Sequence, residues 1–321
     1  MRTAAPYALA LAVLASGLVA GPAHAQLART FVSAASGNDV NDCNRLTPCR
    51  TFQVAHDNTL TSGEITVLDP GGYGAVTITK SISIINDGVG EAGVLVSGGV
   101  NGITIAAGGV ARINLRGLTV KGIGFGGGNG IVFNNAAFMT IENCVVRGLD
   151  GGGSVGNGIV LQPTGASYLA VSKTVVADNA GRGIAVVPTG NNVVRVSLNR
   201  IEAYNNVNGI LISDVLGTGE IRAHVVDSVA AGNSNIGITV QSTTFMAISN
   251  VVVARSVIAN NGVGLAADGP GARLHLGRSV VTGNTTSWTD FGGSAVLDSY
   301  GDNDINGNND GDPAPAVISR K

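Results

Sequence analysis

The sequence predicts an all-β protein wound as a right-handed, single-stranded parallel β-helix, a solenoid with coils of about 27 residues. Three observations carry this prediction: the composition, a repeated glycine motif, and a second repeat in phase with it. Glycine makes up 48 of the 321 residues, aromatic residues 4% and charged residues 12%. This composition is too apolar for a disordered chain and fits many short valine- and isoleucine-rich strands joined by polar corners.

The first repeat is a glycine followed by isoleucine or leucine, which opens a short apolar strand. Successive copies are 25 to 28 residues apart. One such unit cannot bury its apolar face alone, whereas stacked units share a continuous core. The copies begin at Gly102, Gly130, Gly158, Gly183, Gly209, Gly237 and Gly264.

The second repeat has the same pitch. Each copy holds two apolar strands split by a polar corner and ends near an asparagine or glycine. Parallel strands of stacked coils lie about 4.8 Å apart, and the handedness rule for parallel connections makes the winding right-handed. The copies span residues 113–122, 139–148, 169–179, 196–206, 224–233, 251–261 and 274–284.

Equivalent corners of stacked coils should meet in columns. Asn206, Asn233 and Asn260 are 27 residues apart, and Asn179 and Asn284 lie close to the same phase. Asparagine tolerates left-handed turns, and its amide groups can bond to one another along a stack. We therefore expect these side chains to form a structural ladder.

Residues 1–25 have the features of a secretory signal peptide. Arg2 supplies a positive charge, residues 8–19 form a short apolar run, and Ala23-His24-Ala25 is a cleavage site. The sequence thus predicts cleavage after Ala25 and a secreted or periplasmic protein. No later stretch approaches the roughly 20 apolar residues of a transmembrane helix, so we expect no membrane insertion.

The mature chain divides into three parts. We assign residues 26–63 to an N-terminal cap containing a strand, a disulfide loop and a helix. Residues 64–310 form the parallel β-helix, and residues 311–321 form a C-terminal tail. A cap is expected because the open end of a solenoid exposes unpaired strand edges.

Cysteine spacing and helical periodicity define this cap. Cys43 and Cys49 are six residues apart, which predicts a small disulfide loop in an oxidising compartment. Residues 48–60 place Phe52 and Ala55 near one helical face, which predicts a short capping helix. Cys144 is left over in an apolar strand, where a buried free thiol behaves as a small hydrophobic side chain.

The cap and first coil resemble a known family. Residues 32–52, VSAASGNDVNDCNRLTPCRTF, are followed by ITVLDPGGY at residues 65–73. These stretches resemble the start of pectin-lyase-like right-handed β-helix repeat proteins. The resemblance implies the fold rather than an activity, because that superfamily includes lyases, hydrolases, esterases, epimerases, phage tailspikes and proteins without known catalysis.

Charge excludes one class of partner. The whole chain has 19 basic and 21 acidic residues, a net charge of −2, and loss of Arg2 with the signal peptide makes it −3. Proteins that bind nucleic acid usually have a strong basic excess, so we expect no nucleic-acid partner.

Alignment of the second repeat predicts a column of cations at one corner. Lys173, Arg200, Arg255 and Arg278 occupy this position, and Ser228 interrupts them. Such a column on a rigid rod could follow an acidic polysaccharide, since each arginine can fork a carboxylate. The alternative is a solvated corner whose long side chains cover apolar surface.

A calcium site is the one cofactor that the sequence suggests. Asp302, Asp304 and Asn306 precede Gly307 in the pattern of the first half of a calcium loop. The glutamate expected at loop position twelve is replaced by Pro313. The alternative is that these residues are turn residues of the closing coil, and no other cofactor is predicted.

Three functional hypotheses follow. The first is an exported, non-catalytic β-helix that presents a rigid surface and binds acidic polysaccharide. The second is a polysaccharide lyase or hydrolase of the same superfamily with a divergent site. The third is a self-associating adhesin or structural element. The first is preferred because the corners are short and rich in glycine and asparagine, whereas enzymes on such scaffolds use longer loops to wall a cleft.

Overall fold

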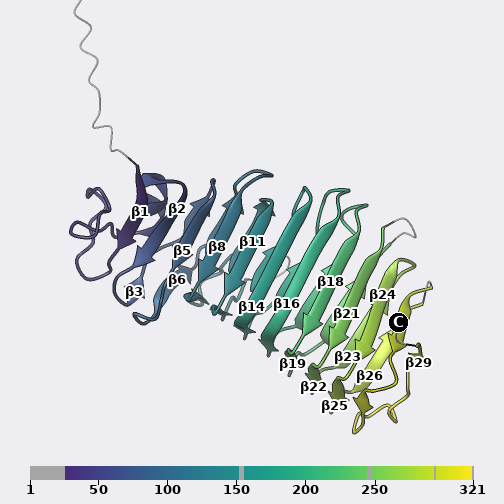
Figure 1. The fold of residues 1–321 in the computed structure, drawn as a ribbon. Helices are drawn as coiled ribbons and strands as arrows, with labels where there is room; N and C mark the ends of the chain where they lie inside the picture. Colours follow the sequence, from purple (N-terminus) through teal and green to yellow (C-terminus); the bar gives the residue numbers. More distant parts are fainter. Residues whose placement is uncertain (1–25, 152–154, 244–246, 293, 320–321) are drawn as a thin grey trace, which may run out of the picture.

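The computed structural model describes residues 26–151, 155–243, 247–292 and 294–319. The predicted signal peptide, residues 1–25 with its cleavage site, lies outside these residues. Figure 1 shows one elongated solenoid with strands of successive coils side by side along its length. These strands pair in parallel. Among the described residues we find no helix with the length and apolar character of a membrane span.

Three faces run along the solenoid, and the first face carries the candidate site. Its strands alternate inward apolar side chains with outward polar ones, as in Arg112–Arg116. In order of pairing, the strands are β1 (Leu27–Val32), β2 (Thr59–Val67), β5 (Ile82–Ile85), β8 (Arg112–Arg116), β11 (Phe138–Glu142), β14 (Ser167–Ala177), β16 (Val194–Tyr204), β18 (Ile221–Val226), β21 (Ser249–Ala254), β24 (Ala272–Gly277), β27 (Val296–Ser299) and β29 (Ala316–Val317).

The second face continues the same hydrogen-bonded sheet, because β14 and β16 run through the corner between the two faces. Apart from the second halves of those two strands, it consists of β3 (Gly71–Gly72), β6 (Ala92–Val96), β9 (Leu118–Gly122), β12 (Val145–Arg147), β19 (Val229–Ala231), β22 (Val257–Ala259), β25 (Val280–Thr282) and β28 (Asp304–Ile305).

The third face is a separate nine-stranded sheet. The glycine repeat of the sequence opens seven of its strands, and the residue after each glycine pairs with its equivalent in the next coil. The strands are β4 (Val76–Ile78), β7 (Ile103–Ala106), β10 (Ile131–Asn135), β13 (Ile159–Leu161), β15 (Arg182–Val186), β17 (Asn208–Ser213), β20 (Ile236–Gln241), β23 (Val263–Asp268) and β26 (Thr286–Asp290).

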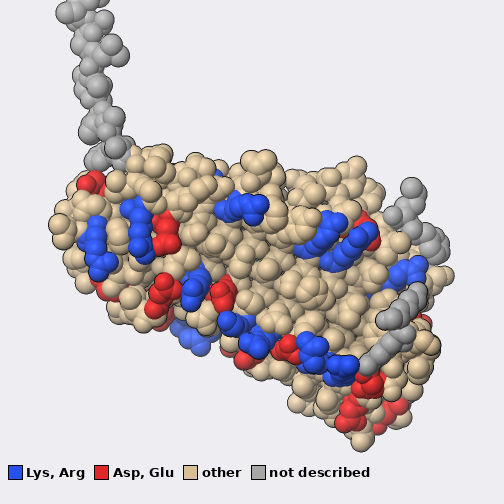
Figure 2. Space-filling model, in the orientation of Figure 1, with Lys and Arg blue, Asp and Glu red and all other residues tan. Residues whose placement is uncertain are grey.

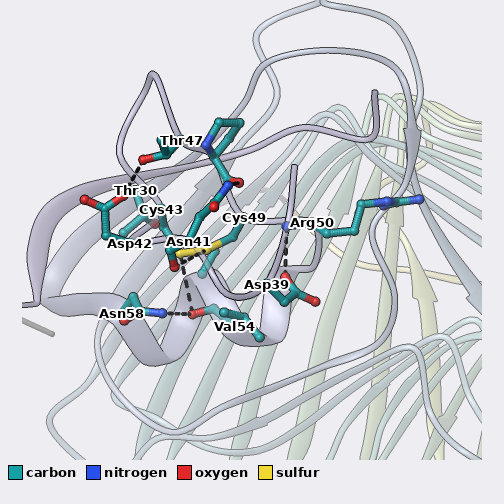
Figure 3. Close-up of a disulfide and its surroundings, with 12 residues drawn as sticks. Thr30, Asp39, Asn41, Asp42, Cys43, Thr47, Cys49, Arg50, Val54 and Asn58 are labelled. Atoms are coloured by element: carbon teal, nitrogen blue, oxygen red, sulfur yellow. Dashed lines mark hydrogen bonds between the residues drawn. A yellow bond between two sulfur atoms is a disulfide. The ribbon is translucent and has the colours of Figure 1, made fainter. Parts of the chain in front are cut away.

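The N-terminal cap is formed as predicted by a helix and a disulfide loop. The helix α1 (Phe52–Asn58) begins after Thr51, whose side chain accepts a hydrogen bond from the Val54 amide, and it buries Phe52. Cys43 and Cys49 form the predicted disulfide, which lies against this helix in Figure 3. The loop is tied to β1, since the Phe31 amide donates to the Cys43 carbonyl at 2.8 Å.

A buried asparagine ladder runs through the corner between the second and third faces. The Nδ2 of Asn206 donates to the Oδ1 of Asn233 at 3.2 Å, and the Nδ2 of Asn233 donates to the Oδ1 of Asn261 at 2.9 Å. The predicted ladder is therefore formed, but Asn261 and not Asn260 is its member. Asn260 is exposed and holds the left-handed corner beside it, at φ 57°. The members are Asn179, Asn206, Asn233, Asn261, Asn284 and Asn308.

The glycine column of the third face packs directly against this ladder. A Cβ atom on Gly209 would lie 2.5 Å from the carbonyl oxygen of Gly237 and 2.9 Å from Nδ2 of Asn233. The same close approach to the next coil recurs at Gly158, Gly183 and Gly237. Any larger residue would push the coils apart, which explains why glycine recurs once per coil.

A second buried ladder consists of hydroxyl groups at the corner between the first and second faces. The Ile201 amide donates to Ser228 Oγ at 3.0 Å, and the Ser228 amide donates to Ser256 Oγ at 3.2 Å. Cys144 occupies the same position in an earlier coil, with Sγ 3.3 Å from the Glu142 carbonyl. Burial raises the pKa of its thiol to about 11, so Cys144 is an unreactive structural residue.

The C-terminal residues complete a further coil. Asp312 Oδ1 accepts hydrogen bonds from the backbone amide and Nδ2 of Asn308, both at 2.8 Å, and so ends the asparagine ladder with a carboxylate. The chain then returns to the first face, where β29 pairs with β27. Part of the segment assigned to a tail, residues 311–321, is therefore incorporated in the solenoid.

We predict that Asn233→Ala lowers the free energy of unfolding by about 4 kcal/mol. The substitution removes the side-chain hydrogen bonds of Asn233 to Asn206 and Ala203 in one neighbouring coil and to Asn261 in the other, and it leaves those buried groups without partners. Chemical denaturation followed by circular dichroism measures this effect. The matched control is Asn235→Ala, which removes an exposed amide contact and should change stability by less than about 0.5 kcal/mol. Equal effects of the two substitutions would contradict a structural role for the ladder.

Candidate functional site

A continuous trough runs along the outside of the first face. It consists of two depressions of about 620 and 560 Å³ that share Asn250 and Val252 in their lining. The first extends from Phe138 to Val252, and the second continues to Tyr300. Figure 2 shows basic residues gathered along two edges of this face, with a strip free of charged residues between them.

One edge of the trough is lined by the first outward side chain of each strand from β11 to β21, and the same position continues to Arg112 on β8 and Arg273 on β24 beyond this lining. Strand register places these side chains in a column, one per coil, which we call the aromatic–arginine row. Because the pairings are parallel, its members are spaced by one strand separation, about 4.8 Å. The row consists of Arg112, Phe138, Tyr168, Arg195, Arg222, Asn250 and Arg273.

The floor of the trough is the next outward column along the same strands. Ala170 and Ser197 lie there beside Thr140 and Val252, and their short side chains leave the depression between taller neighbours. His224 and His275 belong to the same column, two coils apart. The lining of the first depression is therefore mostly apolar, with a few polar groups.

Four of the seven members of the aromatic–arginine row form one continuous stack. The Arg112 guanidinium carbon lies 3.9 Å from the Phe138 ring centroid, and the Phe138 and Tyr168 rings stack at 5.1 Å with an interplanar angle of 12°. The Arg195 guanidinium carbon lies 5.1 Å from the Tyr168 centroid. Each ring therefore contacts the other ring and one arginine. The two guanidinium groups at the ends of the stack are held in fixed orientations.

Ion pairing divides the arginines of this row into two groups. Arg222 is neutralised by Glu220, with Nε–Oε1 and Nη2–Oε2 distances of 2.8 Å each. Arg112, Arg195 and Arg273 make no ion pair with any of the residues that the structure describes. Their guanidinium groups are therefore available to an anion from outside the chain.

The predicted cation column runs along the other side of the first face, and its members Arg255 and Arg278 line the second depression. Lys173, Arg200, Arg255 and Arg278 share one corner and the left-handed backbone conformation, with φ between 49° and 54°. The member from the intervening coil is Asp227 and not Ser228, because Val226 pairs with Ala254 and so places Asp227 beside Arg255. Ser228 is buried in the hydroxyl ladder instead.

Acidic neighbours neutralise most of this column. Lys173 Nζ lies 2.9 Å from Glu142 Oε1, and Arg255 Nε lies 2.7 Å from Asp227 Oδ1. Arg278 Nε is 3.6 Å from Asp302 Oδ2. The sequence therefore located an edge of the trough but not its available cations.

The C-terminal end of the trough contains a histidine with a carboxylate beside it in the next coil. His275 Nδ1 lies 3.7 Å from Asp298 Oδ2, and the imidazole and Tyr300 ring centroids are 6.4 Å apart. Burial lowers the pKa of His275, and the Asp298 carboxylate opposes this shift. The imidazole is therefore neutral at pH 7 and can accept a proton.

The residues of the suggested calcium loop are distributed over the closing coil. Asp302 accepts a hydrogen bond from the Arg278 amide at 3.1 Å. Asp304 in β28 pairs with Val280 in β25, and the Asn306 amide donates to the Val281 carbonyl at 3.2 Å. In the part of the chain that the structure describes, no group of three or more His, Cys, Asp or Glu side chains is arranged to hold a metal ion.

The comparisons with known proteins match the chain by structure. No family model and no curated protein matches the sequence. Among solved structures, pectate lyase Pel9A is 17% identical, with 88% of this chain and 71% of that chain covered and a TM-score of 0.55. The A-module of the mannuronan C-5 epimerase AlgE6 from Azotobacter vinelandii is 15% identical, with 74% and 71% covered and a TM-score of 0.42.

These likenesses concern the fold alone, since the identities are low. The likeness to Pel9A agrees with the parallel pairing of strands along the three faces. The chain has the pectin-lyase-like, right-handed parallel β-helix fold that its sequence predicted.

Proposed function

We propose that the protein is an exported, non-catalytic β-helix that binds an acidic polysaccharide along the trough of the first face. The observation that carries this proposal is a long, shallow trough edged by Arg195, which makes no ion pair with the described residues and whose column continues to Arg112 and Arg273. Such a surface offers apolar contact to sugar rings and charged hydrogen bonds to carboxylates at the same time.

The stacked arginines are suited to this task. A mobile arginine side chain on a protein surface loses conformational entropy when it binds a ligand, whereas Arg112 and Arg195 are already held against Phe138 and Tyr168. Each guanidinium can therefore fork a carboxylate with little further ordering. The trough also follows the solenoid axis across many coils, which suits an extended polymer better than a compact ligand.

Other observations support the same class of ligand and location. The net charge of −2 does not favour nucleic acid, whose binding usually needs a basic excess. Pel9A, which has the same fold, is a pectate lyase. The disulfide between Cys43 and Cys49 is typical of proteins exported to an oxidising compartment.

We predict that Arg195→Ala weakens binding of polygalacturonate or alginate about tenfold, because it removes a charge-assisted hydrogen-bonding group. Tyr168→Ala should weaken it about threefold, since Arg195 then loses the ring that orients it. Affinity electrophoresis through gels containing each polymer measures both effects. Arg147→Ala and Phe125→Ala are the matched controls, because both residues are exposed away from the trough.

The result that contradicts the proposal is equally specific. If the wild-type protein migrates unchanged in every acidic polymer, the trough does not bind acidic polysaccharide. Equal losses in the trough variants and in the controls would also contradict it, because binding would then follow net charge rather than the trough.

The second candidate function is cleavage of the bound polysaccharide, as expected of a divergent lyase or hydrolase. It is favoured by one observation, the neutral His275 at the end of the trough with Asp298 beside it. The 3.7 Å separation of His275 Nδ1 from Asp298 Oδ2 is longer than a hydrogen bond, so the carboxylate would have to move closer before it oriented the imidazole as a general base.

We predict that His275 titrates below the ordinary histidine pKa of 6.5 and that Asp298→Asn lowers its pKa further, because Asp298 is the main influence that raises it. Nuclear magnetic resonance of the imidazole measures both values, with Asp290→Asn as the control carboxylate. If the protein cleaves acidic polysaccharide, His275→Gln should abolish new chain ends while Arg147→Gln, at an exposed position on the second face, retains them. Intact polymer after prolonged incubation with the wild-type protein would exclude catalysis and leave the binding proposal standing.

A further inference from the structure

We propose that His56 is a pH-sensitive latch at the N-terminal end of the solenoid, and that protonation of its imidazole opens the contact between helix α1 and strand β4. This inference does not depend on the proposed binding of polysaccharide. It rests on where the outer backbone amides of β4 find their hydrogen-bond acceptors.

Strand β4 is the first strand of the third face, so one of its edges has no neighbouring strand. The Val76 amide donates to the Gly102 carbonyl at 3.0 Å, toward β7. Because successive amides of a strand point in opposite directions, those of Thr77 and Thr79 point away from β7. They need acceptors from outside the sheet, since a buried or covered amide without a partner costs free energy.

Helix α1 supplies both acceptors from its side chains. The Thr77 amide donates to Gln53 Oε1 at 2.9 Å, and the Thr79 amide donates to His56 Nε2 at 3.2 Å. Asp57 orients both acceptors, because its Oδ1 lies 3.0 Å from Gln53 Nε2 and 2.8 Å from His56 Nδ1. One carboxylate therefore couples the two side chains that close the edge of β4.

This network determines which nitrogen of His56 has the proton. The Asp57 carboxylate can only accept, so Nδ1 has the hydrogen and Nε2 accepts from Thr79 with its lone pair. A second proton on the imidazole has to bind Nε2, where it meets the N–H group of Thr79. The charged imidazole is therefore incompatible with the bond to β4, whereas the amide of Gln53 does not titrate.

The surroundings of His56 favour the neutral imidazole. Its side chain is 3% exposed, and burial lowers its pKa. The Lys80 ammonium group lowers this pKa as well, and the Asp57 carboxylate opposes the shift. Strands β1 and β2 also pack against α1, and their charged residues Arg29 and Glu64 pair with each other at 2.8 Å.

The direction of the pH effect follows from this burial. When the contact opens, His56 becomes solvated and its pKa returns toward the ordinary value of 6.5. The open form thus binds a proton more readily than the closed form, so falling pH favours opening. The effect begins near the ordinary pKa and levels off below the lowered pKa of the closed form. An uncapped β4 is then a sheet edge to which another strand can pair.

The test is amide hydrogen exchange of β4, measured by nuclear magnetic resonance and expressed as protection factors. On going from about pH 7.5 to about pH 5.5, the protection factors of Thr77 and Thr79 should both fall about fivefold. Loss at Thr77 is decisive, because its acceptor Gln53 does not titrate and separates only when the whole contact opens. The Val76 amide, which bonds within the sheet, should keep its protection.

Three variants separate the proton from the contact. In His56→Gln, the new amide can accept from Thr79 as Gln53 accepts on the same helix, so both pH values should give full protection. Asp57→Asn keeps an oxygen acceptor but removes the charge that raises the pKa of His56, so opening should move to more acidic pH. His224→Gln, at an exposed position on the first face, is the control and should open as the wild type does.

Each other result overturns the latch or is decided by a second variant. Full protection of Thr77 at the lower pH contradicts it, as does an equal loss in the wild type and in His56→Gln. Loss confined to Thr79 means that the imidazole moves without opening the contact. If His56→Gln is unprotected at both pH values, Asp57→Asn decides: an acid shift of opening supports the latch, and an unchanged midpoint contradicts it.

Discussion

The contact between the asparagine ladder and the glycine column is the constraint on which the rest of the structure depends. Each ladder amide bonds to the next coil, and each glycine lets the backbones of neighbouring coils approach beside it. Gly209 and Asn233, which meet across neighbouring coils, show both halves of this arrangement. Because buried amides must be satisfied and the glycine site admits no Cβ atom, the corner fixes how one coil sits on the next.

This fixed stacking turns a repeated sequence position into a straight column of side chains. A residue two positions along a strand lies in the adjacent column, and a residue one coil along lies about 4.8 Å away in the same column. The trough is thus a consequence of register. Short side chains such as Ala170 and Ser197 form its floor, and the row containing Tyr168 and Arg195 forms one edge. No inserted loop is required to create this site.

Repetition made the fold predictable from the sequence, and a single misplaced residue limited the prediction of the site. The copy beginning at residue 224 should begin at Ala223, which pairs with Val196 and Val251. That slip placed Ser228 in the cation column in place of Asp227. The aromatic–arginine row was missed although it lies one position before each aligned strand. The ion pair of Arg222 was not predictable, because its partner Glu220 lies just before β18, in a connection outside the repeat.

The most direct test of this account is a crystal structure of the protein with a bound acidic oligosaccharide. The account predicts ligand density in the trough over β11 to β24, running along the solenoid axis, with a carboxylate within hydrogen-bonding distance of the Arg195 guanidinium. Density confined to the second or third face, or a ligand in the trough whose carboxylates avoid Arg195, would contradict it.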